Sequence, residues 1–144
     1  KVARHVDDAV SKGASVVIGG QVHELGGKFY EPTILRDATE DMVFAKEEIF
    51  GPVAPLFKFE TEAEVIAAAN DTEYGLAAAV WTENTSRAVR VSEQLDVGLV
   101  WVNSWFLRDL RTAFGGAKQS GIGREGGVHS LEFYTELSNV CVKL

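Results

Sequence analysis

The sequence has little of several features that mark other classes of protein. It contains one cysteine, Cys141, so no disulfide can form within the chain, and this usage fits a reducing, cytoplasmic compartment. No apolar run approaches the ~20 residues that a membrane-spanning helix needs, and no apolar signal segment is visible. Basic residues number 14 against 21 acidic ones, a net charge of −7. We therefore expect no membrane and no nucleic acid as partners.

The composition that remains is that of an ordinary globular protein. Of the 144 residues, 46% are hydrophobic and 24% are charged, which is enough for one domain with a buried core. The chain starts at Lys1, already inside a helical pattern and without an initiator methionine. This start indicates a piece of a longer protein.

The middle of the chain alternates strand and helix patterns. Three apolar runs, Val53 to Phe59, Leu76 to Trp81 and Val97 to Val102, read as strands. A capping box at Thr61 to Glu64 opens the first intervening helix, and Ala88, Val91 and Leu95 mark the second. Helix-bearing connections of this length, about fifteen residues, suit parallel strands. We expect an α/β fold with a mostly parallel βαβαβ sheet.

The first sixty residues predict shorter elements. A helix spans Val2 to Val10, and a strand follows at Ser15 to Ile18. Phe29 to Leu35 predicts another strand, which Pro32 should place at a sheet edge. Asp41 to Glu48 mixes apolar and acidic residues and predicts a helical turn.

The last twenty residues differ from the rest. Gly123 to Phe133 predicts a helix, and Glu136 to Leu144 alternates apolar and polar residues as a strand does. A terminal strand needs a sheet edge with which to pair. That edge could belong to this chain or to a partner subunit.

A glycine-rich stretch matches the dinucleotide fingerprint GxGxxG at Gly121 to Gly126. The fingerprint requires a strand before it and a helix after it, so that the helix N-terminus faces the pyrophosphate. The preceding residues, Gly115 to Ser120, predict no strand. We therefore favour a structural turn over a phosphate-binding loop.

Two arginines, Arg108 and Arg111, follow the strand Val97 to Val102. Parallel sheets bind ligands beyond the carboxyl ends of their strands, and arginine pairs with planar carboxylates through two parallel hydrogen bonds. The pair could anchor an acidic substrate. A surface ion pair between Arg108 and Asp109 explains the pattern equally well.

Other candidate residues are less informative. Lys46 to Glu48 could be a solvated helix end or could supply a carboxylate to a sugar hydroxyl, and the sequence leaves both open. Cys141 lies in a predicted strand with no histidine nearby, which favours a buried or interface thiol over a nucleophile. No metal-ligand spacing is present among the histidines, which are His5, His23 and His129. Asn70 and Asn84 predict a turn and a helix cap.

Four motifs, in this order and spacing, carry a resemblance to a known family. They are Phe29 to Thr33 (FYEPT), Glu47 to Val53 (EEIFGPV), Asn70 to Leu76 (NDTEYGL), and Phe114 to Glu125, where FGG precedes Lys118, Ser120-Gly121 and Gly123-Arg124-Glu125. Over essentially its whole length the chain resembles the C-terminal part of an NAD(P)-dependent aldehyde dehydrogenase. Residues 1–133 would then belong to the catalytic domain, and residues 134–144 would be an oligomerisation strand, which implies a homo-oligomer.

The resemblance implies roles for particular residues. Glu48 corresponds to a glutamate that hydrogen-bonds the nicotinamide ribose, and Phe50 to an aromatic residue near the nicotinamide of NAD, with NADP not excluded. Arg108 falls in the substrate-anchoring loop, and Phe114 closes that loop near the substrate tunnel. Arg111 is a second, weaker candidate for the anchor.

The resemblance also implies a substrate class and the place of the catalytic residues outside this chain. Asn103 to Leu110 is most similar to the hydroxymuconic and aminomuconic semialdehyde dehydrogenases, which oxidise acidic semialdehydes. In the family a cysteine attacks the aldehyde, hydride passes to the nicotinamide, and a glutamate activates water. Both of those residues would lie upstream of Lys1, so we expect no catalysis by this chain alone. The alternative is a non-catalytic assembly module derived from such an enzyme.

Overall fold

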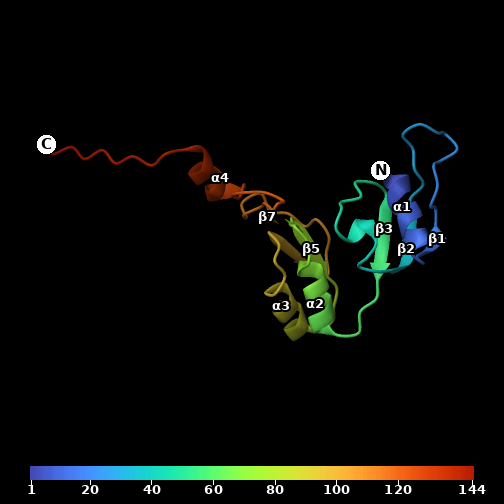
Figure 1. The fold of residues 1–144 in the computed structure, drawn as a ribbon. Coiled ribbons are helices and arrows are strands. Elements are labelled where there is room, and N and C mark those ends of the chain that lie inside the picture. The colour runs from blue at the N-terminus through green and yellow to red at the C-terminus, as the bar shows by residue number, and fades with distance from the viewer. The chain divides into compact units, whose positions relative to one another are not determined.

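The computed structural model describes all residues from Lys1 to Leu144, which divide into two compact units (Figure 1). The first unit is Lys1–Thr61 and the second is Glu62–Leu144. Both mix helices with short strands, as the α/β prediction requires. The longest helix has 10 residues, and no helix is long and apolar enough to cross a bilayer.

The first unit holds a helix, a 3-10 turn and a three-stranded sheet. Its elements are α1 (Val2–Ser11), β1 (Ser15–Ile18), β2 (Thr33–Ala38), η1 (Val43–Ala45) and β3 (Val53–Phe57). The strand order is β1-β2-β3, with β1 antiparallel and β3 parallel to β2. The predicted first helix, first strand and helical turn are all confirmed.

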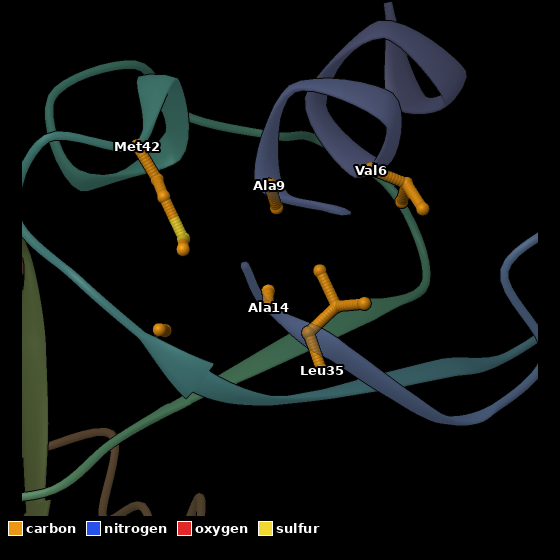
Figure 2. Close-up of a cluster of buried hydrophobic side chains, with 6 residues drawn as sticks. Val6, Ala9, Ala14, Leu35 and Met42 are labelled. Carbon is orange, nitrogen blue, oxygen red and sulfur yellow. The ribbon is translucent and has the colours of Figure 1, made fainter. Parts of the chain in front are cut away.

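The core of the first unit forms between α1 and the sheet. Val6 and Ala9, three positions apart and so on one helix face, are almost fully buried. Leu35 and Met42 are also at most 1% exposed. Figure 2 shows Leu35 pointing from the sheet toward α1, with Met42 directed into the same space. This cluster fixes α1 against β2.

The prediction of an edge strand from Phe29 to Leu35 is wrong in its bounds and its place. The strand β2 begins at Thr33, immediately after Pro32, and lies in the middle of its sheet. Because Pro32 precedes the strand, its missing N–H removes no ladder bond. Tyr30 instead bridges Val22 in the preceding hairpin.

The second unit contains three helices and four short strands. They are α2 (Glu62–Asn70), β4 (Tyr74–Gly75), β5 (Ala77–Val80), α3 (Thr85–Ser92), β6 (Leu99–Val102), β7 (Ala117–Lys118) and α4 (Gly127–Tyr134). Strands β5 and β6 are parallel and joined through α3, as predicted, and β4 pairs antiparallel with β7. The predicted cap is confirmed, because the Asn84 side chain accepts a hydrogen bond from the Arg87 amide at 2.9 Å.

The prediction of a single βαβαβ sheet is wrong. Strand β3 pairs with β2 and not with β5, so the three apolar runs do not share one sheet. An apolar run shows that a strand needs covered faces, but it does not say which edge will pair with it. The predicted parallel pairing is confirmed for β5 with β6 only, and β3 is parallel to a strand that was not predicted as its neighbour, β2.

The terminal strand predicted at Glu136 to Leu144 is absent from the chain by itself. Residues 135–144 form no helix or strand, and Leu137, Val140 and Val142 are 73–95% exposed. A segment becomes a strand only where another edge supplies its hydrogen bonds. Cys141 is exposed, so the expectation of a buried thiol is wrong for the single chain. Its burial at an interface stays a prediction.

Candidate functional site

The turn between η1 and β3 carries the two residues expected on the cofactor side. Phe50 is 84% exposed and has a backbone φ of 52°. This left-handed conformation costs a non-glycine residue on the order of 1 to 3 kcal/mol and persists only where the surroundings impose it. The turn therefore holds an aromatic ring in solvent at an energetic cost, as ligand-binding turns do.

The two adjacent glutamates of this turn differ in their environment. Glu47 is paired, since its Oε2 lies 2.6 Å from Arg4 Nη2 and 3.3 Å from His5 Nε2. The hydrogen bond from Arg4 lowers the pKa of the Glu47 carboxyl below its ordinary value. Glu48 is exposed, and no ion pair engages its carboxylate. Of the two, Glu48 is the carboxylate that can accept new hydrogen bonds.

This pair of side chains fits a nucleoside with a planar ring. A free carboxylate can accept hydrogen bonds from both hydroxyls of a ribose, since its two oxygens carry about four acceptor positions. An exposed aromatic face packs against a flat ring. Glu48 and Phe50 lie two residues apart on one turn, so a single ligand can contact both.

The second unit brings together the two residues expected on the substrate side. The guanidinium carbon of Arg108 lies 4.0 Å from the centre of the Phe114 ring, within the range of a cation–π contact. The side chain of Arg108 is 28% exposed, and its Nη2 donates a hydrogen bond to Glu125. Phe114 and Glu125 exchange two backbone N–H···O bonds of 2.8 Å. An aromatic face and a carboxylate thus hold the guanidinium.

Glu125 is the member of this group that sequence reasoning missed. It lies 17 residues after Arg108, in the glycine-rich return of the loop, and was noted only as part of a family motif. A reciprocal backbone bridge to Phe114 is a non-local contact without a spacing signal. Only the path of the chain reveals it.

The alternative of an ion pair holds for Arg108, but with Glu125 as the partner and not Asp109. Asp109 is instead held by Arg111, whose Nε lies 2.9 and 3.1 Å from the two carboxylate oxygens. These hydrogen bonds lower the pKa of Asp109, with the Arg111 amide contributing. Arg111 is 88% exposed, and its planar fork is committed to this local pair. Arg108 pairs through one nitrogen, Nη2, whereas Arg111 uses both Nε and Nη2, so Arg108 keeps more donors for an anchor.

The loop after β6 folds back onto a buried tryptophan. Trp101 is 8% exposed, and its indole Nε1 donates to the carbonyl oxygen of Leu107 at 2.8 Å. The rings of Trp105 and Phe106 pack at 5.2 and 6.0 Å from it. This cluster shapes the start of the loop that leads to Arg108.

The glycine-rich segment makes close internal backbone contacts. Gly126 has a φ of 98°, and a Cβ there would lie 2.2 Å from the carbonyl oxygen of Thr112. The Gly126 amide, at the start of α4, donates to Ser130 Oγ at 2.8 Å. Arg124 donates to the Gly116 carbonyl oxygen at 2.8 Å. The expectation of no strand before the motif is wrong, because β7 (Ala117–Lys118) precedes it, and the structural turn is supported by these internal partners alone.

An open cavity of about 380 Å³ adjoins this loop. Its wall includes Phe114, Glu125 and Arg124, with Phe133 and Tyr134 of α4. Phe114 and Glu125 thus line the cavity and also contact Arg108 through their side chains. No cluster of three metal-ligating side chains lies here or elsewhere in the chain.

Comparisons with known proteins place the chain in a family. A sequence profile of the aldehyde dehydrogenase family matches residues 1–140. The chain belongs to the aldehyde dehydrogenase family. Relatives include the 2-hydroxymuconic semialdehyde dehydrogenase of Pseudomonas sp. strain CF600, 59% identical over all of this chain and 31% of that protein. The 2-aminomuconic 6-semialdehyde dehydrogenase of Pseudomonas sp. is 54% identical, over all of this chain and 30% of that protein.

A solved structure supports the same aldehyde dehydrogenase fold. The Mycobacterium tuberculosis aldehyde dehydrogenase, complexed with NAD+, has a TM-score of 0.86 at 39% identity and covers 94% of this chain and 28% of its own. The predicted resemblance to this family, and to the muconic semialdehyde enzymes within it, is confirmed. The chain spans about 30% of the length of the curated relatives.

Proposed function

We propose that this chain is the C-terminal section of an enzyme that oxidises an acidic semialdehyde, of the 2-hydroxymuconic type, to the carboxylic acid. Residues 1–133 would complete the catalytic domain, and residues 134–144 would pair with a neighbouring subunit of a homo-oligomer. The oxidant is NAD or NADP. The observation that carries the proposal is the guanidinium of Arg108, held over Phe114 in a loop beyond a parallel strand.

On the cofactor side, this chain binds and orients the nicotinamide and its ribose. Glu48 accepts hydrogen bonds from the nicotinamide ribose, and Phe50 packs beside the nicotinamide ring. The exposed, unpaired carboxylate of Glu48 supports the first role, and the left-handed backbone and exposed ring of Phe50 support the second. When bound, the nicotinamide supplies the hydride acceptor.

On the substrate side, Arg108 anchors the carboxylate at the far end of the aldehyde. The hydrogen bond to Glu125 uses one guanidinium nitrogen, and arginine offers five N–H donors. The ring of Phe114 covers one face of the guanidinium, which excludes water and strengthens its pairing with an anion. Phe114 thus contributes to the anchor as well as to the loop.

The nucleophile of the reaction lies outside this chain in our proposal. The one cysteine, Cys141, sits in an exposed segment without secondary structure. A cysteine nucleophile needs an activating base or a positively charged setting. We expect no NAD reduction by the purified chain with any aldehyde, and measurable turnover would contradict this assignment.

A second candidate function is a non-catalytic assembly module. The exposed apolar residues of the last ten positions, such as Leu137 and Val140, fit a module covered by a partner, and they fit the oligomeric enzyme equally. The genomic context separates the two. An upstream, in-frame cysteine nucleophile supports the enzyme, and a start codon near Lys1 supports the module.

The complete enzyme offers a direct test of the substrate class. We would compare kcat/KM for a carboxylated semialdehyde and for its methyl ester, which has the same chain but no charge. The free acid should be preferred, because only a carboxylate can form charge-assisted hydrogen bonds with Arg108. Equal values for acid and ester would refute the acidic substrate class.

A further inference from the structure

The helix α1 runs alongside the segment that leads to the Phe50 turn. Five contacts join them: Val2 against Gly51, Arg4 and His5 each with Glu47, Asp8 with the Val43 amide, and Lys12 with the Asp41 carbonyl oxygen. As the residue number along the helix rises from 2 to 12, the residue number of the contacted partner falls from 51 to 41. Helix and segment are therefore antiparallel neighbours along their whole length.

These contacts come from one face of the helix. Val2, His5, Asp8 and Lys12 follow spacings of three, three and four, which place side chains in a row on an α-helix. The bonds are short, 2.8 Å from the Val43 amide to Asp8 and 2.6 Å from Lys12 to the Asp41 carbonyl oxygen. The face carrying Val6 and Ala9 packs on the sheet, and Met42 of the segment lies in the same core.

The contact nearest the turn joins both Arg4 and His5 to one oxygen of Glu47. His5 has no exposed surface, and its Nδ1 has no hydrogen-bond partner. With the ring proton on Nε2, His5 donates to Glu47 Oε2 at 3.3 Å, and Nε2 then cannot also accept from Arg4. Arg4 donates to the same Glu47 oxygen at 2.6 Å. A buried ring and a charged fork thus define where Glu47 lies.

The turn is anchored again on its far side. The Thr33 amide of β2 donates to the Pro52 carbonyl oxygen at 2.8 Å. A Cβ at Gly51 would lie 2.4 Å from Val2 Cγ2, so only glycine allows α1 to approach so closely. Between Glu47 and Gly51 lie three residues without regular structure, and one of them, Phe50, has the unfavourable φ of 52°. The flanking anchors impose that conformation.

We propose that Arg4 and His5 are positioning residues that, by holding Glu47, set the turn presenting Glu48 and Phe50 to the nicotinamide cofactor. The inference rests on the proposed function only in assigning the cofactor to those two side chains. Release of Glu47 would let the turn relax from the Phe50 conformation. Cofactor binding would weaken, and the chemical step would be unchanged once cofactor is saturating.

The test uses the complete enzyme with the Glu47→Gln substitution, which removes the charge and keeps the shape. We expect the KM for NAD or NADP to rise about threefold to tenfold. The kcat at saturating cofactor and the KM for aldehyde should stay unchanged. Arg4→Lys, which keeps a charge beside Glu47, should raise the cofactor KM less than Arg4→Ala. A general loss of folded enzyme would instead lower kcat and leave the KM for cofactor and the KM for aldehyde unchanged. That result would overturn the proposal.

Glu62→Gln is a matched control. Glu62 lies in the second unit and accepts hydrogen bonds from Arg87 at 3.3 Å and Arg90 at 2.6 Å. The substitution is chemically the same and also breaks a pair with arginine. It should leave the cofactor KM unchanged, and an equal rise in this variant would overturn the role of Arg4 and His5.

Hydrogen exchange separates this inference from the proposed function. The Lys46 and Glu47 amides donate to the Val43 carbonyl oxygen at 3.2 and 2.9 Å, so they report on the turn without cofactor. We expect both to exchange faster in Glu47→Gln. Unchanged exchange would overturn the positioning role. Faster exchange with an unchanged cofactor KM would support the anchoring of the turn and contradict the cofactor assignment. In that case Glu48→Gln should also leave the cofactor KM unchanged.

Discussion

Substitution of Arg108 by alanine tests the substrate anchor most directly. The change removes a guanidinium whose carbon lies 4.0 Å from the Phe114 ring centre, and with it the charge-assisted bonds to a substrate carboxylate. Loss of such a contact costs about 2 to 4 kcal/mol, which is roughly a thirtyfold to thousandfold decrease in kcat/KM. The variant also leaves Glu125 without its cation, so a negative charge would face the incoming carboxylate.

The assay measures steady-state NAD or NADP reduction by the complete enzyme with two aldehydes of equal length, one carboxylated and one uncharged. The decrease should be confined to the carboxylated aldehyde. Arg111→Ala is the matched control in the same loop, because Arg111 is 88% exposed and paired with Asp109. It should leave both aldehydes within about threefold of the parent enzyme. Adding Glu125→Gln to Arg108→Ala should recover the part of the loss that comes from repulsion.

Two results would refute the anchor. An unchanged kcat/KM for the carboxylated aldehyde in Arg108→Ala would show that the guanidinium does not contact the substrate. Equal losses for both aldehydes would assign Arg108 to the structure of the loop, through Phe114 and Glu125, and not to recognition of charge.

Three further predictions concern stability. Leu35→Ala should lower the free energy of unfolding by about 3 to 5 kcal/mol in urea titrations, because Leu35 has no exposed surface, and a loss below about 1 kcal/mol would contradict the core assignment. Gly126→Ala should cost about 1 to 3 kcal/mol, since its φ is 98° and the new Cβ would meet the Thr112 carbonyl oxygen, so an unchanged melting temperature would be inconsistent with the loop. Hydrogen bonds from Arg4 and Arg111 lower the pKa of Glu47 and Asp109 from ordinary values of 4.5 and 3.8, so their stabilisation is present at neutral pH and is lost as the pH falls through the lowered values. Melting temperatures measured from neutral to acid pH should fall only below about pH 4.5, and a decrease that is complete above about pH 5 would contradict this.

Local elements of this chain could be predicted because their signals are local. The burial of Val6 and Ala9 follows from their helical spacing, and the cap at Asn84 follows from a side chain that reaches an amide three residues away. The parallel pairing of β5 and β6 follows from two apolar runs with a helix between them. Family membership was likewise evident from motifs in a fixed order.

The pairing of distant groups could not be predicted in the same way. The apolar pattern of β3 is equally compatible with a neighbour in either unit, and the structure pairs it with β2. Arg108 had Asp109 beside it in sequence, yet its partner is Glu125. An ion pair forms between whichever charges the backbone brings within reach, and the glycine turns after Phe114 return Glu125 to that point.

The sequence by itself therefore determined the helices, the α/β class, the family and the residues Glu48, Phe50, Arg108 and Phe114 as candidates. Only the tertiary structure decided that Glu47 is paired while Glu48 is free, and that Arg108 lies on Phe114. The physical reason is the range of each interaction. Helical periodicity and caps act within a few residues, whereas the environment of a charge depends on residues 17 to 43 positions away.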